Sequence, residues 1–254
     1  MPHDTTIPYE ENPNHMIIWL DQTIGDPEKC IPLKKAFSSQ ADPKNETPVK
    51  LRDKDYAGIL DIVGPVSVAF EGVEFLFAAF TNVESCIECF EQNQDKRIFF
   101  ITSGSMGEII IPQIISKFAN IFTNPETDES YNSIYIFCLN KEYHSRWARA
   151  FRNYVQIFDF ETDLLSRMIH DIADYFLTEG KQLLDEDPPN YPAAKHRLTW
   201  SHELYQRYDK MGDTDNMCIM DRMEKVPVRK ELNEVNELLE NIDDEMASSS
   251  DEDD

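Results

Sequence analysis

The 254-residue sequence lacks the features that mark several common functional classes. No apolar run approaches the roughly 18 residues that a membrane-spanning helix needs. Residues 1–14 have neither the basic nor the apolar region of a secretory signal, and we expect them to be disordered. No stripe of Lys and Arg is present to bind a phosphate backbone. We therefore expect a cytoplasmic protein that binds neither nucleic acid nor membranes.

Cysteine is scarce, with five residues that are scattered along the chain. An odd number of scattered cysteines favours free thiols in a reducing compartment. Cys86 and Cys89 have the spacing of a redox motif, but they fall inside a predicted helix, whereas a redox thiol is expected at a helix start. A zinc site would need two further ligands at suitable spacing, and none is found. Two buried thiols are the simpler interpretation.

Acidic residues are abundant and unevenly placed. The net charge is −24, and residues 185–254 contain 20 acidic against 8 basic residues. The last 24 residues contain 11 acidic residues and no basic one. Such a run is typical of a solvated, interacting segment. We predict a partly helical extension over 186–230, and then an acidic tail over 231–254 that contains a short amphipathic helix and binds protein partners, basic ones in particular.

Short apolar runs alternate with helical patterns between residues 15 and 185. Five runs have the nearly continuous hydrophobicity of strands that are buried on both faces: 16–20, 73–80, 97–102, 133–138 and 155–158. The alternation predicts βαβ units and thus an α/β fold, a doubly wound five-stranded parallel sheet of the flavodoxin type. Residues 38–72 predict an insertion after the first helix that holds a helix or an edge strand.

Several helix starts are marked by residues that bind free backbone amides. These starts are Asp26-Pro27, Thr81 to Glu84, Ser105 to Glu108 and Asn140. Pro112 lies inside the helix that follows Ser105, where a proline removes a backbone donor, and it predicts a break or kink there.

The best candidate ligand site is the turn that contains Ser103, Gly104, Ser105 and Gly107, between a buried strand and a helix start. Ligands of open α/β sheets bind at the carboxyl ends of strands, and helix N-terminal amides favour an anion. The turn lacks the lysine of the Walker pattern and the third glycine of the dinucleotide fingerprint, and Glu108 would repel a phosphate. The alternative interpretation is a tight strand-to-helix turn.

Two further residues are expected near this turn. Asp21 ends the first strand, where a carboxylate could hold Mg²⁺, but such a site needs a second acid, and Asp26 is better explained as a helix cap. His144 lies in the first turn of a helix without a nucleophile or an orienting acid for a triad. A structural carboxylate and an exposed histidine are the alternatives, and His170 is interpreted as an ordinary helix residue. We predict no catalytic residue, no metal site and no cofactor.

Ser248, Ser249 and Ser250 each lie three residues before an acidic residue. This spacing suits acidophilic kinases, and each phosphate would add negative charge to the tail. A solubilising, disordered chain end explains the same pattern equally well.

The alternation of strands and helices, with Asp21 at the end of the first strand, resembles the receiver domain of response regulators. Thr102-Ser103 stands where a receiver has its phosphate-accepting aspartate, no acid pairs with Asp21, and no lysine follows the last strand. The resemblance therefore implies a pseudo-receiver domain over 15–185 that forms no aspartyl phosphate.

A second resemblance rests on four segments within residues 16–184: Ile18 to Asp21, Arg97 to Ser105, Ile134 to Cys138 and Trp147-Ala148. These segments are similar to the N-terminal domain of rotifer-type multidomain proteins that carry ADP-ribosyltransferase or tetratricopeptide modules. Neither module has its pattern in this chain, so the transferase activity is not expected. The first functional hypothesis is a non-enzymatic regulatory or adaptor protein. The alternative is a nucleotide- or NAD-handling enzyme that uses the crevice at Asp21, Ser103–Gly107 and His144, and a third hypothesis is a thiol sensor at Cys86 and Cys89.

Overall fold

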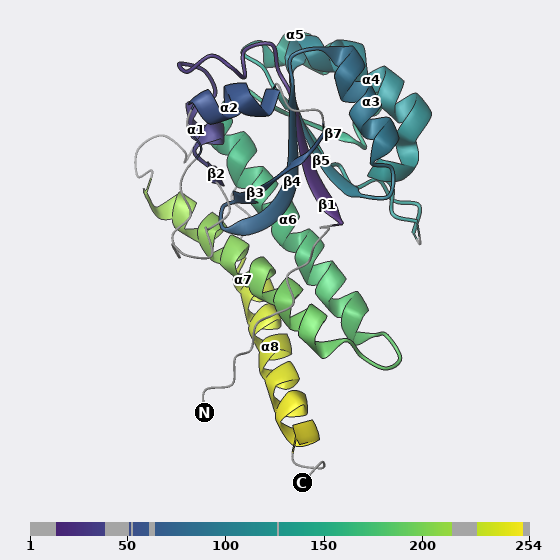
Figure 1. Ribbon diagram of the computed structural model, residues 1–254, viewed down its shortest axis with the longest axis vertical. Helices are drawn as coiled ribbons and strands as arrows, with labels where there is room; N and C mark the ends of the chain where they lie inside the picture. Colours follow the sequence, from purple (N-terminus) through teal and green to yellow (C-terminus); the bar gives the residue numbers. More distant parts are fainter. Residues whose placement is uncertain are drawn as a thin grey trace. The chain divides into compact units, whose positions relative to one another are not determined.

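A mostly parallel sheet with helices on its faces forms one of two compact units of the chain, residues 10–165 (Figure 1). The other unit contains residues 166–254 and is helical where it is described. The computed structural model describes residues 14–38, 51, 53–60, 64–125, 127–214 and 228–250. The division between the two units falls inside a helix, after residue 165.

Within the described residues the sheet has seven strands, in the order β2-β3-β4-β1-β5-β6-β7. The five predicted runs form the parallel strands β1 (His15–Leu20), β4 (Val73–Phe80), β5 (Arg97–Ser103), β6 (Ile134–Phe137) and β7 (Val155–Phe158). Two antiparallel strands, β2 (Phe37–Ser38) and β3 (Val66–Phe70), extend the sheet beyond β4. The prediction of an α/β fold is therefore confirmed, and the strand number of five is wrong.

A tight hairpin explains the extra strands. Glu71 and Gly72 connect β3 to β4 with φ angles of 47° and 97°. A two-residue turn of the type that matches strand twist requires positive φ at both positions, which glycine adopts without strain. The predicted insertion 38–72 thus supplies β3, which lies between β2 and β4 rather than at the edge of the sheet, and it also contains the helix α2 (Asp53–Leu60). The remaining parts of this insertion, residues 39–50, 52 and 61–63, lie outside the described residues.

Both faces of the sheet carry large hydrophobic side chains. On one face, Met16 and Ile18 pack with residues of α3 (Val83–Gln92) and α4 (Gly104–Phe118). On the opposite face, Trp19 contacts the rings of Phe37 and Tyr56. Tyr56 comes from α2 and donates a hydrogen bond to the backbone of α1 (Ile31–Lys34), so α1 and α2 belong to this second face (Figure 1).

Several predicted helix starts are displaced. The first helix begins at Ile31 and not after Asp26, because the Asp26 carboxylate accepts a hydrogen bond from the Glu28 amide in a turn. The cap of α3 is Asn82, whose side chain accepts from the Ser85 amide, and not Thr81. Each of these side chains binds an amide close to itself, so neighbouring Asp, Asn and Thr residues compete for the same role.

Two other expectations concern the middle of the unit. The cap at Asn140 is confirmed: its side chain accepts from the Tyr143 amide at the start of α5 (Lys141–Ala148). Pro112 does not end α4, which continues to Phe118. Short 3-10 turns follow α4 and α5, over Ala119–Phe122 and Arg149–Phe151.

The described part of the second unit contains three long helices: α6 (Glu161–Leu184), whose first turn belongs to the first unit, α7 (Tyr191–Thr214) and α8 (Arg229–Ser250). α6 and α7 pair antiparallel, since Phe176 contacts Trp200 and the Ser201 hydroxyl donates to the Ala173 carbonyl. α8 packs against α7 and buries Val235 and Ile242. The predicted short amphipathic helix is thus a 22-residue helix, and residues 251–254 lie outside the described residues.

None of the described helices combines the length and the apolarity needed to cross a membrane.

Gly180 of α6 packs against Leu198 of α7 so closely that no side chain fits at this position. A Cβ atom at this position would lie 2.7 Å from Leu198 Cγ. We expect Gly180→Ala to lower the free energy of unfolding by about 1–2 kcal/mol, because overpacking outweighs the helix propensity that alanine gains. Urea denaturation measures the change.

Gly58→Ala is the matched control, because Gly58 is exposed in α2 and an added Cβ would have no atom within 4 Å. This substitution is expected to stabilise the protein by up to about 1 kcal/mol. Equal stabilisation by both substitutions would contradict the close approach at Gly180.

Candidate functional site

The predicted ligand site lies at the carboxyl ends of β1 and β5. These strands are parallel neighbours, with Leu20 paired to Thr102, so Asp21 and Ser103 leave the sheet side by side. After β1 the chain leads to α1, and after β5 it leads to α4, which packs on the other face. A doubly wound sheet opens a ligand crevice where the connections diverge in this way.

The Asp21 carboxylate is buried and already bound within its own turn. Its Oδ1 accepts hydrogen bonds from the Thr23 amide at 2.7 Å and from the Thr23 hydroxyl at 2.8 Å. Within the described part of the chain, no hydrogen bond or ion pair joins Asp21 to Ser103 or His144. These contacts match the structural carboxylate that the sequence offered as the alternative to a Mg²⁺ ligand.

Gly104 and His144 are brought together, as the proposed crevice required. A Cβ atom at Gly104 would lie 2.6 Å from His144 Nε2 and 2.8 Å from Cys138 Cβ, so only glycine leaves room for the imidazole. The indole N–H of Trp147 donates to His144 Nδ1 at 3.1 Å. The neutral ring therefore carries its proton on Nε2.

Among the described residues, no side chain activates the hydroxyls of Ser103 and Ser105 in the turn. Ser103 is the N-cap of α4 by backbone conformation, but its side chain caps none of the helix amides. Ser105 is exposed inside the first turn, so the predicted capping box with Glu108 is wrong. His144 cannot serve as a base toward either serine, because Nε2 is protonated and Nδ1 accepts from Trp147.

Gly107 has a packing role. It is buried, and a Cβ atom there would lie 3.1 Å from the methyl group of Thr102 and 3.4 Å from the Trp147 ring. Both glycines of the turn thus allow α4 to approach the residues around α5. These contacts favour the interpretation as a tight strand-to-helix turn over that of an anion-binding site.

A second acid lies near Asp21, and the sequence analysis missed it. The pKa of Glu161, at the start of α6, is raised by burial and by the charge of Asp21, although the Leu33 backbone donates to it. Burial and the same two carboxylates raise the pKa of the Cys30 thiol to about 12. No spacing in the sequence connects residues 21 and 161, because only the packing of α6 and of the turn after β1 at the same edge of the sheet brings them together.

Lys34 is the cation beside these acids. Its side chain is buried, and Nζ donates to the Asp26 carbonyl. It favours the charged form of Glu161 but does not outweigh burial. An anionic ligand at this edge would therefore meet two carboxylates and one lysine that is already engaged.

A separate cavity of about 240 Å³ lies at the carboxyl end of β4 and the start of α3. Its lining includes Ala79, Asn82, Ser85 and Cys89. Burial raises the pKa of the Cys89 thiol to about 12, despite a hydrogen bond from Asn93. Cys86 is buried more deeply, and its pKa is raised well above the usual value. Both thiols are protonated at neutral pH, which speaks against the thiol sensor.

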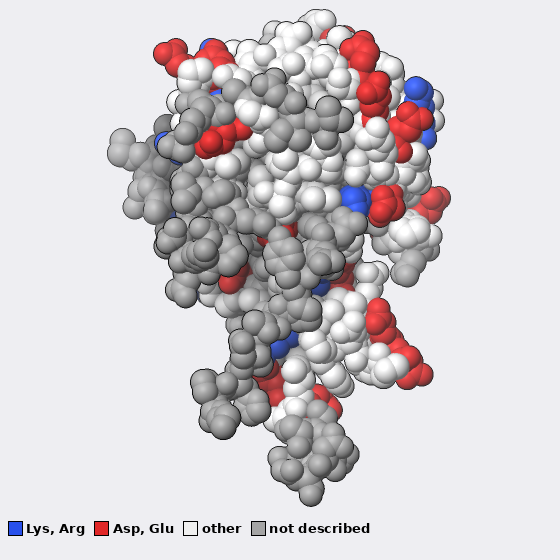
Figure 2. All heavy atoms as spheres, in the orientation of Figure 1, with Lys and Arg blue, Asp and Glu red and all other residues white. Residues whose placement is uncertain are grey.

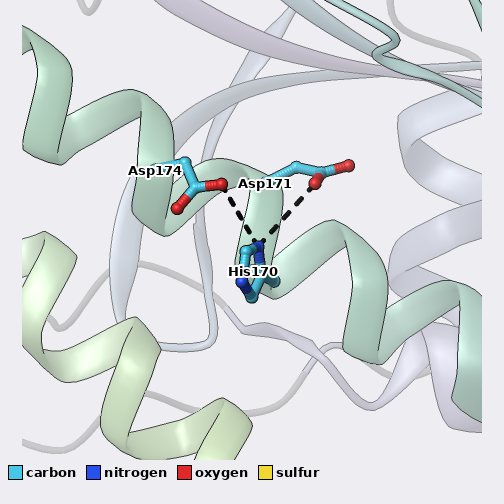
Figure 3. A group of neighbouring side chains, drawn as sticks. All are labelled: His170, Asp171 and Asp174. Carbon is cyan, nitrogen blue, oxygen red and sulfur yellow. Dashed lines mark ion pairs between the residues drawn. The ribbon is translucent and has the colours of Figure 1, made fainter. Parts of the chain in front are cut away.

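His170, Asp171 and Asp174 form a cluster in the second unit (Figure 3). His170 Nδ1 lies 3.2 Å from Asp174 Oδ2 and 3.9 Å from Asp171 Oδ1. The sequence analysis treated His170 as ordinary, although a histidine with acids at the first and fourth following positions is a detectable signal. On a helix, the fourth following residue lies on the same face.

The candidate phosphorylation sites lie at the end of α8. Ser248 is exposed, and its hydroxyl donates to the Glu245 carbonyl at 2.9 Å. Ser249 and Ser250 complete the helix, but their side chains lie outside the described residues. A phosphate at a helix C-terminus is repelled by the helix dipole, so modification here would weaken the last turn.

No protein-family model matches the chain, and no curated protein or solved structure is significantly similar to it. The resemblance to receiver domains, and to the N-terminal domains of rotifer-type multidomain proteins, thus stays a prediction from the sequence. The chemistry of the protein has to be inferred from its own side chains.

Glu161 provides a test of the buried acid pair. Because its pKa is raised in the folded state, its carboxylate favours folding when protonated and opposes it as pH rises. We expect Glu161→Gln to raise the melting temperature at pH 7.5, with the difference from wild type disappearing near pH 4. Glu91→Gln, at an exposed position of α3, is the control and should shift neither value. A stability difference that is independent of pH would contradict the assignment.

Proposed function

We propose that this chain is a non-enzymatic regulatory or adaptor protein. In this proposal the α/β unit is a pseudo-receiver scaffold, and the acidic C-terminal helix binds a basic protein partner. The observation that carries it is the contact of His144 with Gly104, because it fills the corner where a doubly wound domain would hold its ligand.

The strand order supports a receiver-type scaffold. The parallel strands follow the order β4-β1-β5-β6-β7, which corresponds to the 2-1-3-4-5 order of flavodoxin and receiver domains with a switch point at β1 and β5. The residues that would supply chemistry there are used otherwise. Asp21 binds Thr23, and His144 accepts from Trp147.

The exposed side of α8 supports a basic partner. Glu237, Glu240, Asp244 and Glu245 are exposed, and the first three lie along one side of the helix at i, i+3 and i+7. Among the described residues coloured in Figure 2, acidic side chains are spread over the visible face and basic ones form no broad patch. A basic segment would therefore be attracted from a distance and oriented by α8.

Other acidic residues of α8 are already neutralised. Glu234 forms an ion pair with Lys181 of α6, and Asp243 forms one with Lys195 of α7. These pairs hold α8 in place within the second unit, which leaves the four exposed carboxylates as the acidic face available to a partner.

Neutralising this acidic face tests the partner class. The variant Glu237→Gln, Glu240→Gln, Asp244→Asn, Glu245→Gln should bind a lysine-rich peptide about tenfold more weakly at low salt, since each exposed pair contributes a few tenths of a kcal/mol. Fluorescence anisotropy at several salt concentrations measures the affinity.

The matched control removes four exposed carboxylates from α3, from the loop between α3 and β5, and from α4: Glu84→Gln, Glu91→Gln, Asp95→Asn and Glu108→Gln. It changes the net charge equally but leaves α8 intact, so its affinity should stay close to wild type. Equal losses in both variants would indicate attraction by net charge alone and would overturn the role of α8.

Nucleotide binding tests the non-enzymatic part of the proposal. We expect no shift of the melting temperature with 1–5 mM ATP, GTP or NAD, because the crevice offers an anion two carboxylates and a filled corner. A shift that disappears in Asp21→Ala or Ser105→Ala, or turnover that these variants abolish, would replace the adaptor with a nucleotide-handling enzyme.

A further inference from the structure

One turn of α6 brings an imidazole nitrogen and two carboxylates to a common point (Figure 3). The three donor atoms lie within 4.8 Å of one another. Donors bound to zinc at about 2.0–2.2 Å lie about 3–3.5 Å apart in tetrahedral or octahedral arrangements. The 3.2 Å separation of His170 Nδ1 and Asp174 Oδ2 falls in this range, and a small rotation of Asp171 would bring its oxygen from 3.9 Å into it.

The imidazole of His170 is a buried polar group on α6. It is 9% exposed, and neither ring nitrogen has a hydrogen-bond partner among the described residues. The Nδ1 contact with Asp174 is an approach of two atoms without hydrogen-bond alignment. Tyr205 and Tyr208 of α7 close off the ring, with centroid distances of 5.9 Å and 5.0 Å. Buried polar atoms are normally paired, and the partners within reach of Nδ1 are the carboxylates of Asp174 and Asp171, which an ion could join to the ring.

The two carboxylates are held by neighbours of the kind that support metal ligands. The Tyr205 hydroxyl donates to Asp174 Oδ1, which leaves Oδ2 facing His170. Arg167 pairs at 2.8 Å with Asp171 Oδ1, the same oxygen that lies 3.9 Å from His170 Nδ1, so a bound ion would share this oxygen with Arg167. Such outer contacts fix the orientation of ligating carboxylates.

The charge of the cluster favours a cation. With a neutral imidazole, Asp171, Asp174 and Arg167 leave one net negative charge, and Glu231 and Glu234 of α8 add negative potential at Tyr205. The Asp174 side chain is 49% exposed, so an ion can reach the cluster from solvent.

From this arrangement we propose that His170, Asp171 and Asp174 form a binding site for a divalent transition-metal ion, Zn²⁺ by the chemistry of its donors. One imidazole nitrogen and two carboxylate oxygens suit zinc, whereas Mg²⁺ and Ca²⁺ favour sets made of oxygen alone. Three protein donors leave at least one coordination position for water or for a side chain of a partner. The site is independent of the acidic face of α8.

Metal titration of the full chain tests the site. Isothermal titration with Zn²⁺, and absorption spectroscopy with Co²⁺ as a coloured substitute, should show one more bound ion in wild type than in His170→Gln or Asp174→Asn. If a weak site survives in either variant, its Kd should rise at least tenfold. His202→Gln is the control, because His202 lies on α7 outside the cluster and contacts Gln206. It should bind as wild type does.

Circular dichroism shows whether each variant is folded. Asp174→Asn is the safer variant, since half of that side chain is exposed and the amide oxygen still accepts from Tyr205. Equal stoichiometry and affinity in wild type, His170→Gln and Asp174→Asn would overturn the proposal. A Co²⁺ spectrum that is identical in wild type and Asp174→Asn would also overturn it, because bound cobalt would then lie elsewhere.

Discussion

Strand β1 is buried along its whole length between two parallel neighbours, and the α/β unit depends on this arrangement. Each residue from His15 to Leu20 is at most 1% exposed, and β4 and β5 flank the strand on both edges. A strand in this position must have hydrophobic cover on both faces. α3 and α4 supply the cover on one face, and the aromatic cluster around Trp19 supplies it on the other. The polar residues that follow β1, beginning with Asp21, therefore lie at the edge of the sheet formed by the carboxyl ends of the strands.

A doubly wound sheet would bind a ligand at that edge, but the polar side chains there already contact other residues of the fold: Asp21 accepts from Thr23, and His144 accepts from Trp147. Gly104 is required because the His144 ring lies against it, and His144 is oriented by Trp147. Burial, together with the carboxylates of Asp21 and Glu161, raises the pKa of the Cys30 thiol to about 12, so the thiol is protonated at neutral pH and is a poor nucleophile. These contacts engage the polar groups of this edge within the fold, and the proposal of a partner-binding protein rests on them.

The second unit is organised by a different close approach. Gly180 lets Leu198 pack against α6, and this sets the register in which Ser201 meets Ala173 and Tyr205 meets Asp174. The aromatic side chains of α7 then cover His170, which lies beside the largely buried carboxylate of Asp171 and the half-exposed carboxylate of Asp174. Without α7, the same three residues of α6 would be an ordinary polar face of an amphipathic helix.

The sequence by itself determined the α/β class, all five parallel strands and the cap at Asn140, because continuous hydrophobic runs and local hydrogen bonds are written into neighbouring residues. The sequence offered an edge strand within 38–72 as an alternative to a helix, but it did not place β2 and β3 in the sheet, because β2 is only two residues long and the pairing of β3 depends on its neighbours. Only the tertiary structure decided which polar groups meet. Residues distant in the chain meet in three places: Glu161 lies near Asp21, His144 lies against Gly104, and Tyr205 donates to Asp174. Such contacts depend on how helices and strands pack, and this packing leaves no local pattern in the sequence.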